Sequence, residues 1–483
     1  MQPNVIPIKP VPIDTTDQEQ ALYEVRKKIY PRAVTGWFAN WRIALIISTQ
    51  VLFYCTAWFQ WNGRQSVLFD LAARKFYVFG IVFWPQDFIY LTLLLTISAF
   101  SLFLFTAVAG RLFCGYACPQ TVYTEIFLWI ERSIEGDRSH RMKLDQGPLT
   151  LEKFFKKSFK HSAWIVLAMW TGFTFVGYFT PIRGLFLDFA QTKLSGWELF
   201  WIIFYAFATY DNAGWMREQV CKYMCPYARF QSVMFDRDTL VITYDTKRGE
   251  PRGARSRKAD LATSGLGHCV DCEICVQVCP TGIDIRNGLQ SDCIGCAACI
   301  DGCDQVMDKM GYPKGLIRYA TENAMEHRYS WREMIKRVFR PRVLIYTGLL
   351  WTLIFATGFS IWARTPIKVD IIRDRAMLTR QSDEKYVENV YQLRVMNTDE
   401  KPHRFVISAT GLPELQMISN LQNLQVGPTA SVIVPIRLRL DTAKTEPGSH
   451  RIQFTVEAND NDNHSTPEVF FIHEKSVFIV PRR

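Results

Sequence analysis

The chain has 483 residues, of which 48% are hydrophobic, and it carries a formal net charge of +10 at pH 7. This length suits two or three domains. The apolar residues are concentrated in a few blocks, whereas residues 366–483 have the composition of a soluble domain. The positive charge lies in particular loops, as in membrane proteins, and this distribution argues against nucleic-acid binding. The sequence has no motif for nucleotide binding, which argues against ATP-driven transport.

After an N-terminal segment over 1–40, five apolar stretches are long enough to cross a bilayer as helices. The first lacks a cleavage site of small residues, so we expect an uncleaved anchor. Residues 67–84 are partly apolar but carry charges, and they predict an interfacial re-entrant segment. The predicted spans are 41–59, 87–109, 162–180, 197–215 and 343–362, and the first four make a transmembrane region over 41–245.

The charge of the loops predicts the orientation, because cytoplasmic loops gather Lys and Arg. Segments 26–42, 110–160 and 217–342 hold five, nine and twenty such residues, whereas 60–85 and 182–196 hold three and two. Five alternating spans place the charge-rich segments on one side. We therefore expect a multi-pass membrane protein, with its N-terminus and all cysteine motifs in the cytoplasm and its C-terminal region exported.

Residues 366–483 alternate between apolar and polar positions in short runs such as "VYQLRVMN" and "HRIQFTVEA". Turn signals separate six or seven such runs, which predicts an immunoglobulin-like β-sandwich. The region has no cysteine, so no disulfide can hold it together. We expect a docking or scaffold domain without chemistry of its own.

Eight cysteines fall into two runs of the pattern C-x-x-C-x-x-C-x-x-x-C within residues 269–303. In ferredoxins with two clusters, the fourth cysteine of each run binds the other cluster. Structural zinc is the alternative, since it also binds C-x-x-C pairs. The spacing predicts two [4Fe–4S] clusters in a ferredoxin-like module over 269–310, one held by Cys269, Cys272, Cys275 and Cys303, the other by Cys293, Cys296, Cys299 and Cys279.

Acidic residues outnumber basic ones around these runs. Six acids, Asp301 among them, face one base, Arg286, within 269–304, and negative charge near a cluster should lower its potential. These acids could equally serve solubility. The linker over 246–268 contains "KRGEPRGARSRK", whose charge suits lipid headgroups, the acidic face of the ferredoxin module or plain solvation. A connecting segment over 311–342 follows the module and leads to the last span at 343–362.

A second pattern, C-x-Y-x-C-P, occurs once after each of two apolar stretches, in "RLFCGYACPQ" and "QVCKYMCPYA". Proline suits the first turn of a new helix, so we expect a helix break at each pair. The recurrence indicates an internal repeat that brings four thiols together at the cytoplasmic face. Soft thiolates select Cu(I), zinc or an iron–sulfur centre. A disulfide or plain packing is the alternative for these catalytic candidates, which are Cys114, Cys118, Cys221 and Cys225.

Four other residues are candidates for a role in or beside the predicted membrane region. Met216 and Met224 could add thioether ligands, although packing is the favoured role. Asp211 lies within a predicted span, where a carboxylate is costly and either contacts another helix or serves as a relay. Cys55 is expected to pack.

Longer stretches match a known family: "YPRAVTGWFANWR", "NAGWMREQVCKYMCPYARFQ" and "RGEPRG". With the two cysteine patterns and the C-terminal sandwich, they resemble the cytochrome c oxidase accessory proteins known as CcoG, FixG or RdxA. The resemblance implies an oxidoreductase that reduces Cu(II) to Cu(I) and helps assemble the cbb(3)-type oxidase. It implies that the two cysteine runs bind clusters and that Cys114, Cys118, Cys221 and Cys225 bind copper or relay electrons.

The partners expected are membrane lipid, a cytoplasmic electron donor, copper ions and assembly factors or subunits of the oxidase, but no nucleic acid. A homodimer is compatible with the sequence. Two other functions stay open. One is a quinone-linked ferredoxin-type module without copper chemistry, and the other is an assembly scaffold that is not an enzyme.

Overall fold

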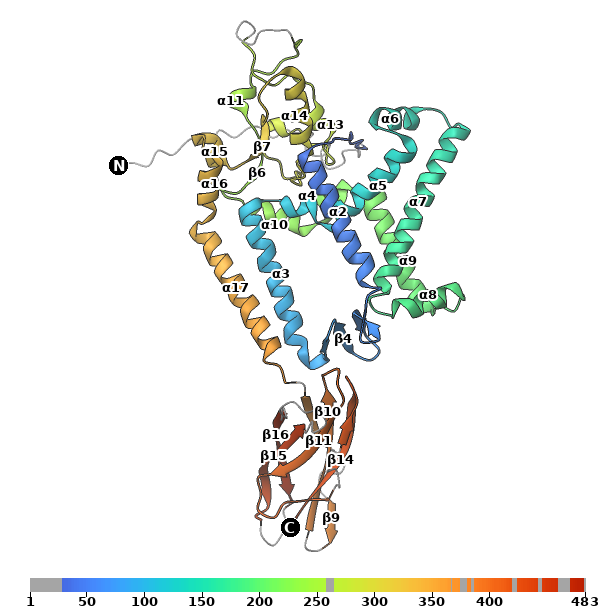
Figure 1. Ribbon diagram of the computed structural model, residues 1–483, viewed down its shortest axis with the longest axis vertical. Helices are drawn as coiled ribbons and strands as arrows, with labels where there is room; N and C mark the ends of the chain where they lie inside the picture. Colours follow the sequence, from blue (N-terminus) through green and yellow to red (C-terminus); the bar gives the residue numbers. More distant parts are fainter. Residues whose placement is uncertain are drawn as a thin grey trace, which may run out of the picture. The chain divides into compact units, whose positions relative to one another are not determined.

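The computed structural model describes residues 28–257, 265–365, 367–373, 380–383, 386–418, 424–441, 445–458 and 470–481. The first 27 residues of the predicted N-terminal segment and residues 258–264 of the basic linker lie outside the described residues. The chain forms two compact units, each gathering segments that are far apart in the sequence (Figure 1). The first unit comprises the described parts of 1–46, 106–164 and 211–335, and the second those of 47–105, 165–210 and 336–483.

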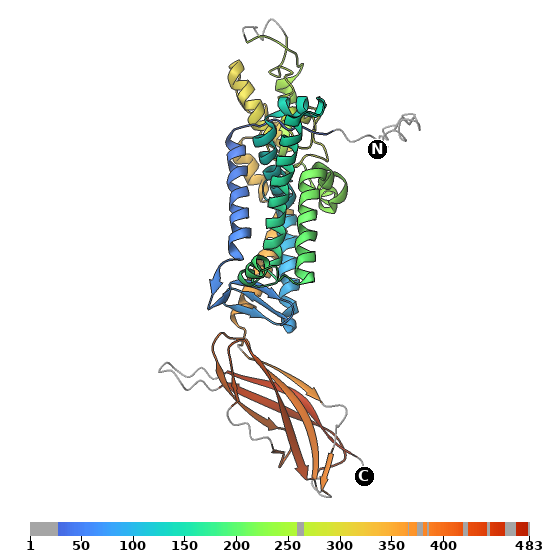
Figure 2. The same ribbon diagram turned by 90° about the vertical axis from the view of Figure 1, so that its right-hand side faces the viewer.

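The first unit combines short helices with a two-stranded antiparallel sheet, in which β6 pairs with β7 (Figures 1 and 2). Gly and Pro recur along this part of the chain and keep its elements short. Its main core joins this sheet to α14 and to buried cysteines. The elements are α4 (Leu112–Tyr116), α5 (Pro119–Glu135), α6 (Arg138–Gln146), the π-helical segments η2 (Asp211–Met216) and η3 (Val220–Met224), α10 (Pro226–Met234), β6 (Val241–Tyr244), α11 (Thr246–Gly249), α13 (Ile274–Gln277), the 3-10 helix η4 (Ile285–Asn287), α14 (Ala298–Met310), β7 (Ile317–Ala320), α15 (Glu322–His327) and α16 (Trp331–Val338).

Helix α14 also completes the start of α2 (Trp37–Thr56). The buried carboxylate of Asp301 accepts hydrogen bonds from the backbone N–H groups of Phe38 and Ala39, at 3.3 and 2.7 Å. A carboxylate suits this position, because the first N–H groups of a helix have no partner within it and carry partial positive charge. A Cβ on Gly36 would clash with this carboxylate. Asp301 therefore links the ferredoxin module to the first long helix.

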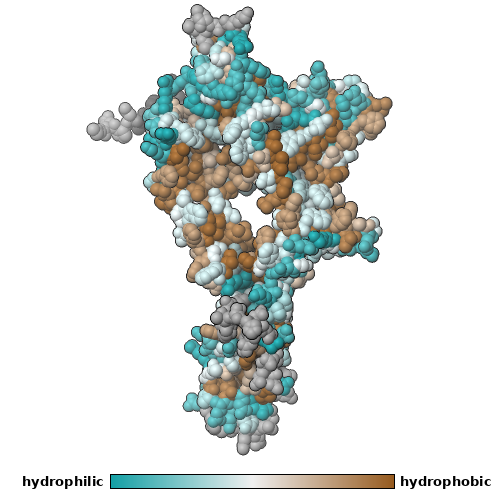
Figure 3. Space-filling model, viewed as in Figure 1, coloured by the Kyte–Doolittle hydropathy of each residue, from teal (hydrophilic) through white to brown (hydrophobic). Residues whose placement is uncertain are grey.

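Within the described residues, three helices are long and apolar enough to cross a membrane: Trp37–Thr56, Pro85–Ala109 and Pro341–Trp362. Few of their residues are buried within the chain, and Figure 3 shows hydrophobic side chains exposed along them. The predicted spans 162–180 and 197–215 correspond to two further helices that do not meet this criterion. The number of spans stays a prediction. The helices whose bounds have not yet been given are η1 (Pro85–Asp87), α3 (Phe88–Ala109), α7 (Leu151–Val176), α8 (Ile182–Ala190), α9 (Gly196–Tyr210) and α17 (Pro341–Trp362).

The re-entrant segment predicted over 67–84 is wrong, because these residues form an antiparallel three-stranded sheet. The charged residues make its first turn: Asp70 Oδ1 accepts a hydrogen bond from Ala73 N at 2.8 Å, and Arg74 adopts a left-handed conformation with φ of 55°. The strands are β3 (Val67–Asp70), β4 (Lys75–Val78) and β5 (Ile81–Phe83), preceded by the ribbon of β1 (Gln60–Trp61) and β2 (Arg64–Gln65).

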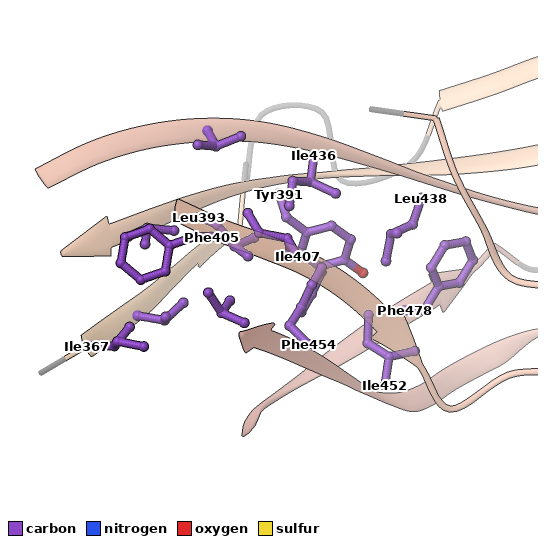
Figure 4. Close-up of a cluster of buried hydrophobic side chains, with 14 of the residues drawn as sticks. Ile367, Tyr391, Leu393, Phe405, Ile407, Ile436, Leu438, Ile452, Phe454 and Phe478 are labelled. Carbon is purple, nitrogen blue, oxygen red and sulfur yellow. The ribbon is translucent and has the colours of Figure 1, made fainter. Parts of the chain in front are cut away.

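The predicted C-terminal sandwich is confirmed, with nine strands in the described residues. One sheet has the order β12-β14-β10-β8 with β9 beside β10, and the other has the order β13-β11-β15-β16. Alternate residues of both sheets meet in one core around Tyr391, Phe405 and Phe454 (Figure 4). The strands are β8 (Ile367–Arg373), β9 (Arg380–Asp383), β10 (Tyr386–Asn397), β11 (His403–Thr410), β12 (Gln416–Met417), β13 (Leu424–Val426), β14 (Ser431–Asp441), β15 (Gly448–Ala458) and β16 (Phe470–Val480).

Candidate functional site

The two cysteine runs fold into matching loops. In the first, Asp271 and Glu273 have left-handed φ values of 53° and 55°. In the second, Gly295 and Ala297 stand at the same positions relative to their cysteines and have φ values of 70° and 59°. Residues other than Gly rarely adopt this conformation, and such strain clusters at functional sites. The repeated turns curl each loop so that its thiols converge.

The eight thiols separate into two groups in the structure, and the assignment of each group to one cluster stays a prediction. The thiol of Cys303 interacts electrostatically with Cys275, Cys269 and Cys272, and these four line one cavity. Cys299 interacts with Cys296, Cys293 and Cys279, and more weakly with Cys275. We call Cys269, Cys272, Cys275 and Cys303 the first quartet, and Cys279, Cys293, Cys296 and Cys299 the second quartet.

The donor set of each quartet fits a [4Fe–4S] cluster. All eight cysteines are free, and helix α14 contributes one ligand to each quartet, Cys299 and Cys303. Burial raises the pKa of Cys275, Cys293 and Cys303 to about 12, so these thiols are protonated until a metal displaces the proton. No three His, Cys, Asp or Glu side chains in the described part of the chain converge on a position for a single metal ion.

The basic linker forms a wall of the first quartet. The N–H of Cys269 donates to the carbonyl of Gly249, and the carbonyl of Cys269 accepts from the N–H of Gly253, both at 3.3 Å. Arg255 donates to the Tyr312 hydroxyl at 3.1 Å and to the Cys269 carbonyl at 3.4 Å. Of the roles considered for this linker, contact with the ferredoxin module is the one its described residues make.

The C-x-Y-x-C-P pairs lie at helix breaks, as the prolines predicted. Cys118 is the N-cap of α5 and Cys225 the N-cap of α10, with the proline at the first helical position of each. Backbone N–H groups of Gln120 and Thr121 point at the Cys118 thiol and favour its thiolate, although burial raises its pKa overall. We call Cys114, Cys118, Cys221 and Cys225 the paired thiols.

Hydrogen bonds join the two pairs into one site. Gln120, after the first pair, donates to the carbonyl of Arg217, before the second, at 3.1 Å. The Cys114 thiol donates to Gln231 Oε1 of α10 at 3.4 Å. Cys221 interacts electrostatically with the other three paired thiols. Burial raises the pKa of Cys114 to about 11 and that of Cys221 to about 12, so both are neutral until a metal binds. The four paired thiols thus lie near one another, although no three of them converge on a position for a single metal ion.

The paired thiols lie directly against the second quartet. A Cβ on Gly115 would come within 2.8 Å of the backbone N and Cα of Cys296, so the backbones of these two segments are in direct contact. Lys222, inside the second pair, forms an ion pair of 3.1 Å with Asp292. A cavity of about 40 Å³, enough for a few water molecules, is lined by Cys221, Cys296 and other residues.

A buried charge network supports the second pair, and sequence reasoning did not find it. Glu131 on α5 is fully buried and accepts a hydrogen bond from Arg217 at 2.7 Å, with Arg141 and Lys160 also within ion-pair distance. Arg217 joins η2 to η3 in a left-handed conformation with φ of 47°. Glu131 therefore fixes the turn that precedes Cys221. No local pattern could reveal contacts across 86 residues.

The remaining candidates are Met216, Met224, Asp211 and Cys55. Met224 is 56% exposed and Cys55 is exposed, so the packing predicted for both within the chain is wrong. Met216 is half-buried and ends η2, which Asp211 begins. π-Helical turns often mark functional positions.

Comparison with known proteins places these features in a family. The model described as a 4Fe-4S dicluster domain matches residues 216–322, a 4Fe-4S binding domain matches 91–135, and the IG-like fold at the C-terminal of FixG matches 357–481. The nitrogen fixation protein FixG of Rhizobium meliloti is 36% identical over 480 residues, which cover 92% of each chain. The chain belongs to the FixG/RdxA family.

RdxA of Cereibacter sphaeroides is 36% identical over 443 residues, which cover 87% of this chain and 90% of RdxA. A crystal structure of a FixG-related protein from Vibrio parahaemolyticus covers 24% of this chain and 98% of its own, at 29% identity and a TM-score of 0.21. The FixG/RdxA membership and the matched domains make the chain a ferredoxin-type iron–sulfur electron-transfer protein. Its apolar helices indicate a membrane protein.

Proposed function

We propose that the chain is an inner-membrane cupric reductase that helps assemble the cbb(3)-type cytochrome c oxidase. In this proposal the ferredoxin module is cytoplasmic and the sandwich periplasmic, as the loop charges predict. The first and second quartets hold the two [4Fe–4S] clusters, which supply one-electron storage when bound. The observation that carries the proposal is the backbone contact between Gly115, which lies between Cys114 and Cys118, and Cys296 of the second quartet.

The paired thiols bind copper as substrate. Soft thiolate prefers the monovalent ion, so the site itself favours reduction of Cu(II) by one electron. That electron comes from an external one-electron donor, and the thiol protons displaced by copper binding pass to solvent. The N-cap position of Cys118 favours thiolate charge, because helix N-termini carry partial positive charge. The thiols, deprotonated by copper binding, then hold Cu(I) for delivery.

The test is the double substitution Cys114→Ser and Cys118→Ser in the full chain, purified without oxygen. We expect copper reduction to be lost while the iron content and the EPR signals of the reduced clusters stay. Cys55→Ser is the matched control, because it removes a lone exposed thiol from α2, and it should keep full activity. Unchanged copper reduction in the double variant would reject the role of the paired thiols.

The same preparation distinguishes the other two functions. A quinone-linked module predicts that the reduced clusters are oxidised by a soluble quinone and that no copper binds. The cavity of about 40 Å³ beside Cys221 is too small for a quinone, since small-molecule sites typically measure 300–1,000 Å³, so this function needs another site. A scaffold predicts that variants without clusters still support oxidase assembly in cells.

A further inference from the structure

Two arginines beside the second quartet each have a buried guanidinium nitrogen without a hydrogen-bond partner among the described residues. The guanidinium of Arg111 donates only to carbonyl oxygens, those of Ser291, Ala228 and Cys293, the last at 3.2 Å. Arg111 is 7% exposed, and its Nε is buried without a hydrogen-bond partner among the described residues. The Nε of Arg42, which lines the cavity beside Cys296, is likewise buried without a hydrogen-bond partner among the described residues.

A buried cation without a counter-charge is costly. In the described part of the chain neither Arg42 nor Arg111 has a carboxylate within ion-pair distance. Asp292 pairs with Lys222 at 3.1 Å, and Glu125 pairs with Arg132 at 3.0 Å. Asp301, which interacts electrostatically with Arg42, accepts two backbone N–H groups at the start of α2. Four thiolates and their iron cube carry net negative charge, so a cluster held by the second quartet supplies the missing counter-charge.

Two cations lie beside the first quartet. Arg286 is paired with two carboxylates, those of Asp284 at 2.7 Å and Asp271. Arg255 donates to the Cys269 carbonyl at 3.4 Å, and its Nη2 is buried without a hydrogen-bond partner, so among the described residues the first quartet has one such arginine and the second has two. Asp304 follows Cys303 directly, and its charge opposes negative charge on that thiol. Reduction adds a further negative charge to a cluster. It is therefore easier at the second quartet and harder at the first.

We propose that Arg111 and Arg42 give the second quartet the higher reduction potential and so make it the exit of the ferredoxin module toward the paired thiols. The exit role rests on the proposed function, whereas the order of potentials does not. The geometry agrees with this direction. Arg111 immediately precedes the first C-x-Y-x-C-P helix, and its carbonyl approaches Gly295 closely enough that a Cβ there would lie 3.1 Å away.

The entry side follows from exposure. Cys272 of the first quartet is exposed, whereas Cys296 is buried and Cys293 and Cys299 are only partly accessible. An electron donor can therefore approach the first quartet from solvent. One electron enters there and one leaves for Cu(II), so the charge balances at each turnover.

The test is a redox titration of the full-length protein followed by EPR, without copper. Cys303→Ser and Cys279→Ser assign the signals to the first and second quartets. We expect the second-quartet signal to have the higher potential, and Arg111→Gln to lower it while the first-quartet potential stays. Arg111→Lys should restore most of the shift, because it keeps the charge but not the fork of hydrogen bonds.

Arg237→Gln is the matched control, since Arg237 is a largely exposed arginine paired with Glu322, and it should move neither potential. If Arg111→Gln loses iron, Arg42→Gln takes its place with the same expectation. The proposal is overturned if the first quartet has the higher potential, or if neither arginine variant lowers that of the second. Because copper is absent, failure of copper reduction leaves this result standing.

Discussion

The contact at Gly115 offers a direct measurement of how closely the paired thiols must approach the ferredoxin module. In Gly115→Ala the new Cβ would lie 2.8 Å from Cys296 backbone atoms, whereas ordinary contact begins at 3.4 Å. One backbone must therefore move by at least 0.6 Å. Such overpacking costs about 1–3 kcal/mol. Alanine recovers up to about 1 kcal/mol of helix propensity within α4.

We expect the free energy of unfolding to fall by about 1–2 kcal/mol. For a unit of about 150–250 residues this lowers the melting temperature by about 2–8 °C. The assay is the thermal loss of iron–sulfur absorbance, with copper reduction measured on the same samples. Gly184→Ala is the control, because this glycine lies in α8 with nothing within 4 Å of its Cβ position, so alanine there should be neutral or stabilising. If both variants melt alike and reduce copper alike, the close contact at Gly115 is not required.

Three further predictions follow from contacts in the first unit. Asp301→Ala removes the cap of α2 and should cost about 1–3 kcal/mol, seen as faster hydrogen exchange in the first turn of α2; unchanged exchange would contradict the capping role. Cys275→Ser and Cys303→Ser should remove one and the same EPR signal and Cys279→Ser the other, and any other grouping would refute the quartets. Glu131→Ala leaves buried cations unpaired and should cost about 3–5 kcal/mol, measured as loss of folded protein during purification, whereas a normal yield would show that the network is dispensable.

The sequence predicted those features that depend on local spacing. The two cysteine runs imply the quartets because their interval repeats, and the proline after Cys118 or Cys225 implies a helix start because it fixes the backbone there. The strands of the sandwich follow from alternation, since each has one buried face.

Other features depend on contacts that no local pattern encodes. Residues 67–84 look like a membrane segment because their strands are short and aromatic. The turn that separates the first two strands is marked by one side-chain hydrogen bond, to Asp70. Asp301 looks like one of several acids around the clusters, yet its partner is a helix start 263 residues earlier. Glu131 and Arg217 are equally unremarkable until the fold joins them.

The cap on α2 has a consequence for biogenesis. The ribosome makes this helix early, but the carboxylate that completes its first turn lies on α14, between Cys299 and Cys303. Each of these cysteines belongs to a different quartet, so we expect the binding of both clusters to hold α14 in this place. The proposed clusters would then also protect the first turn of α2, and hydrogen exchange there would report iron loading.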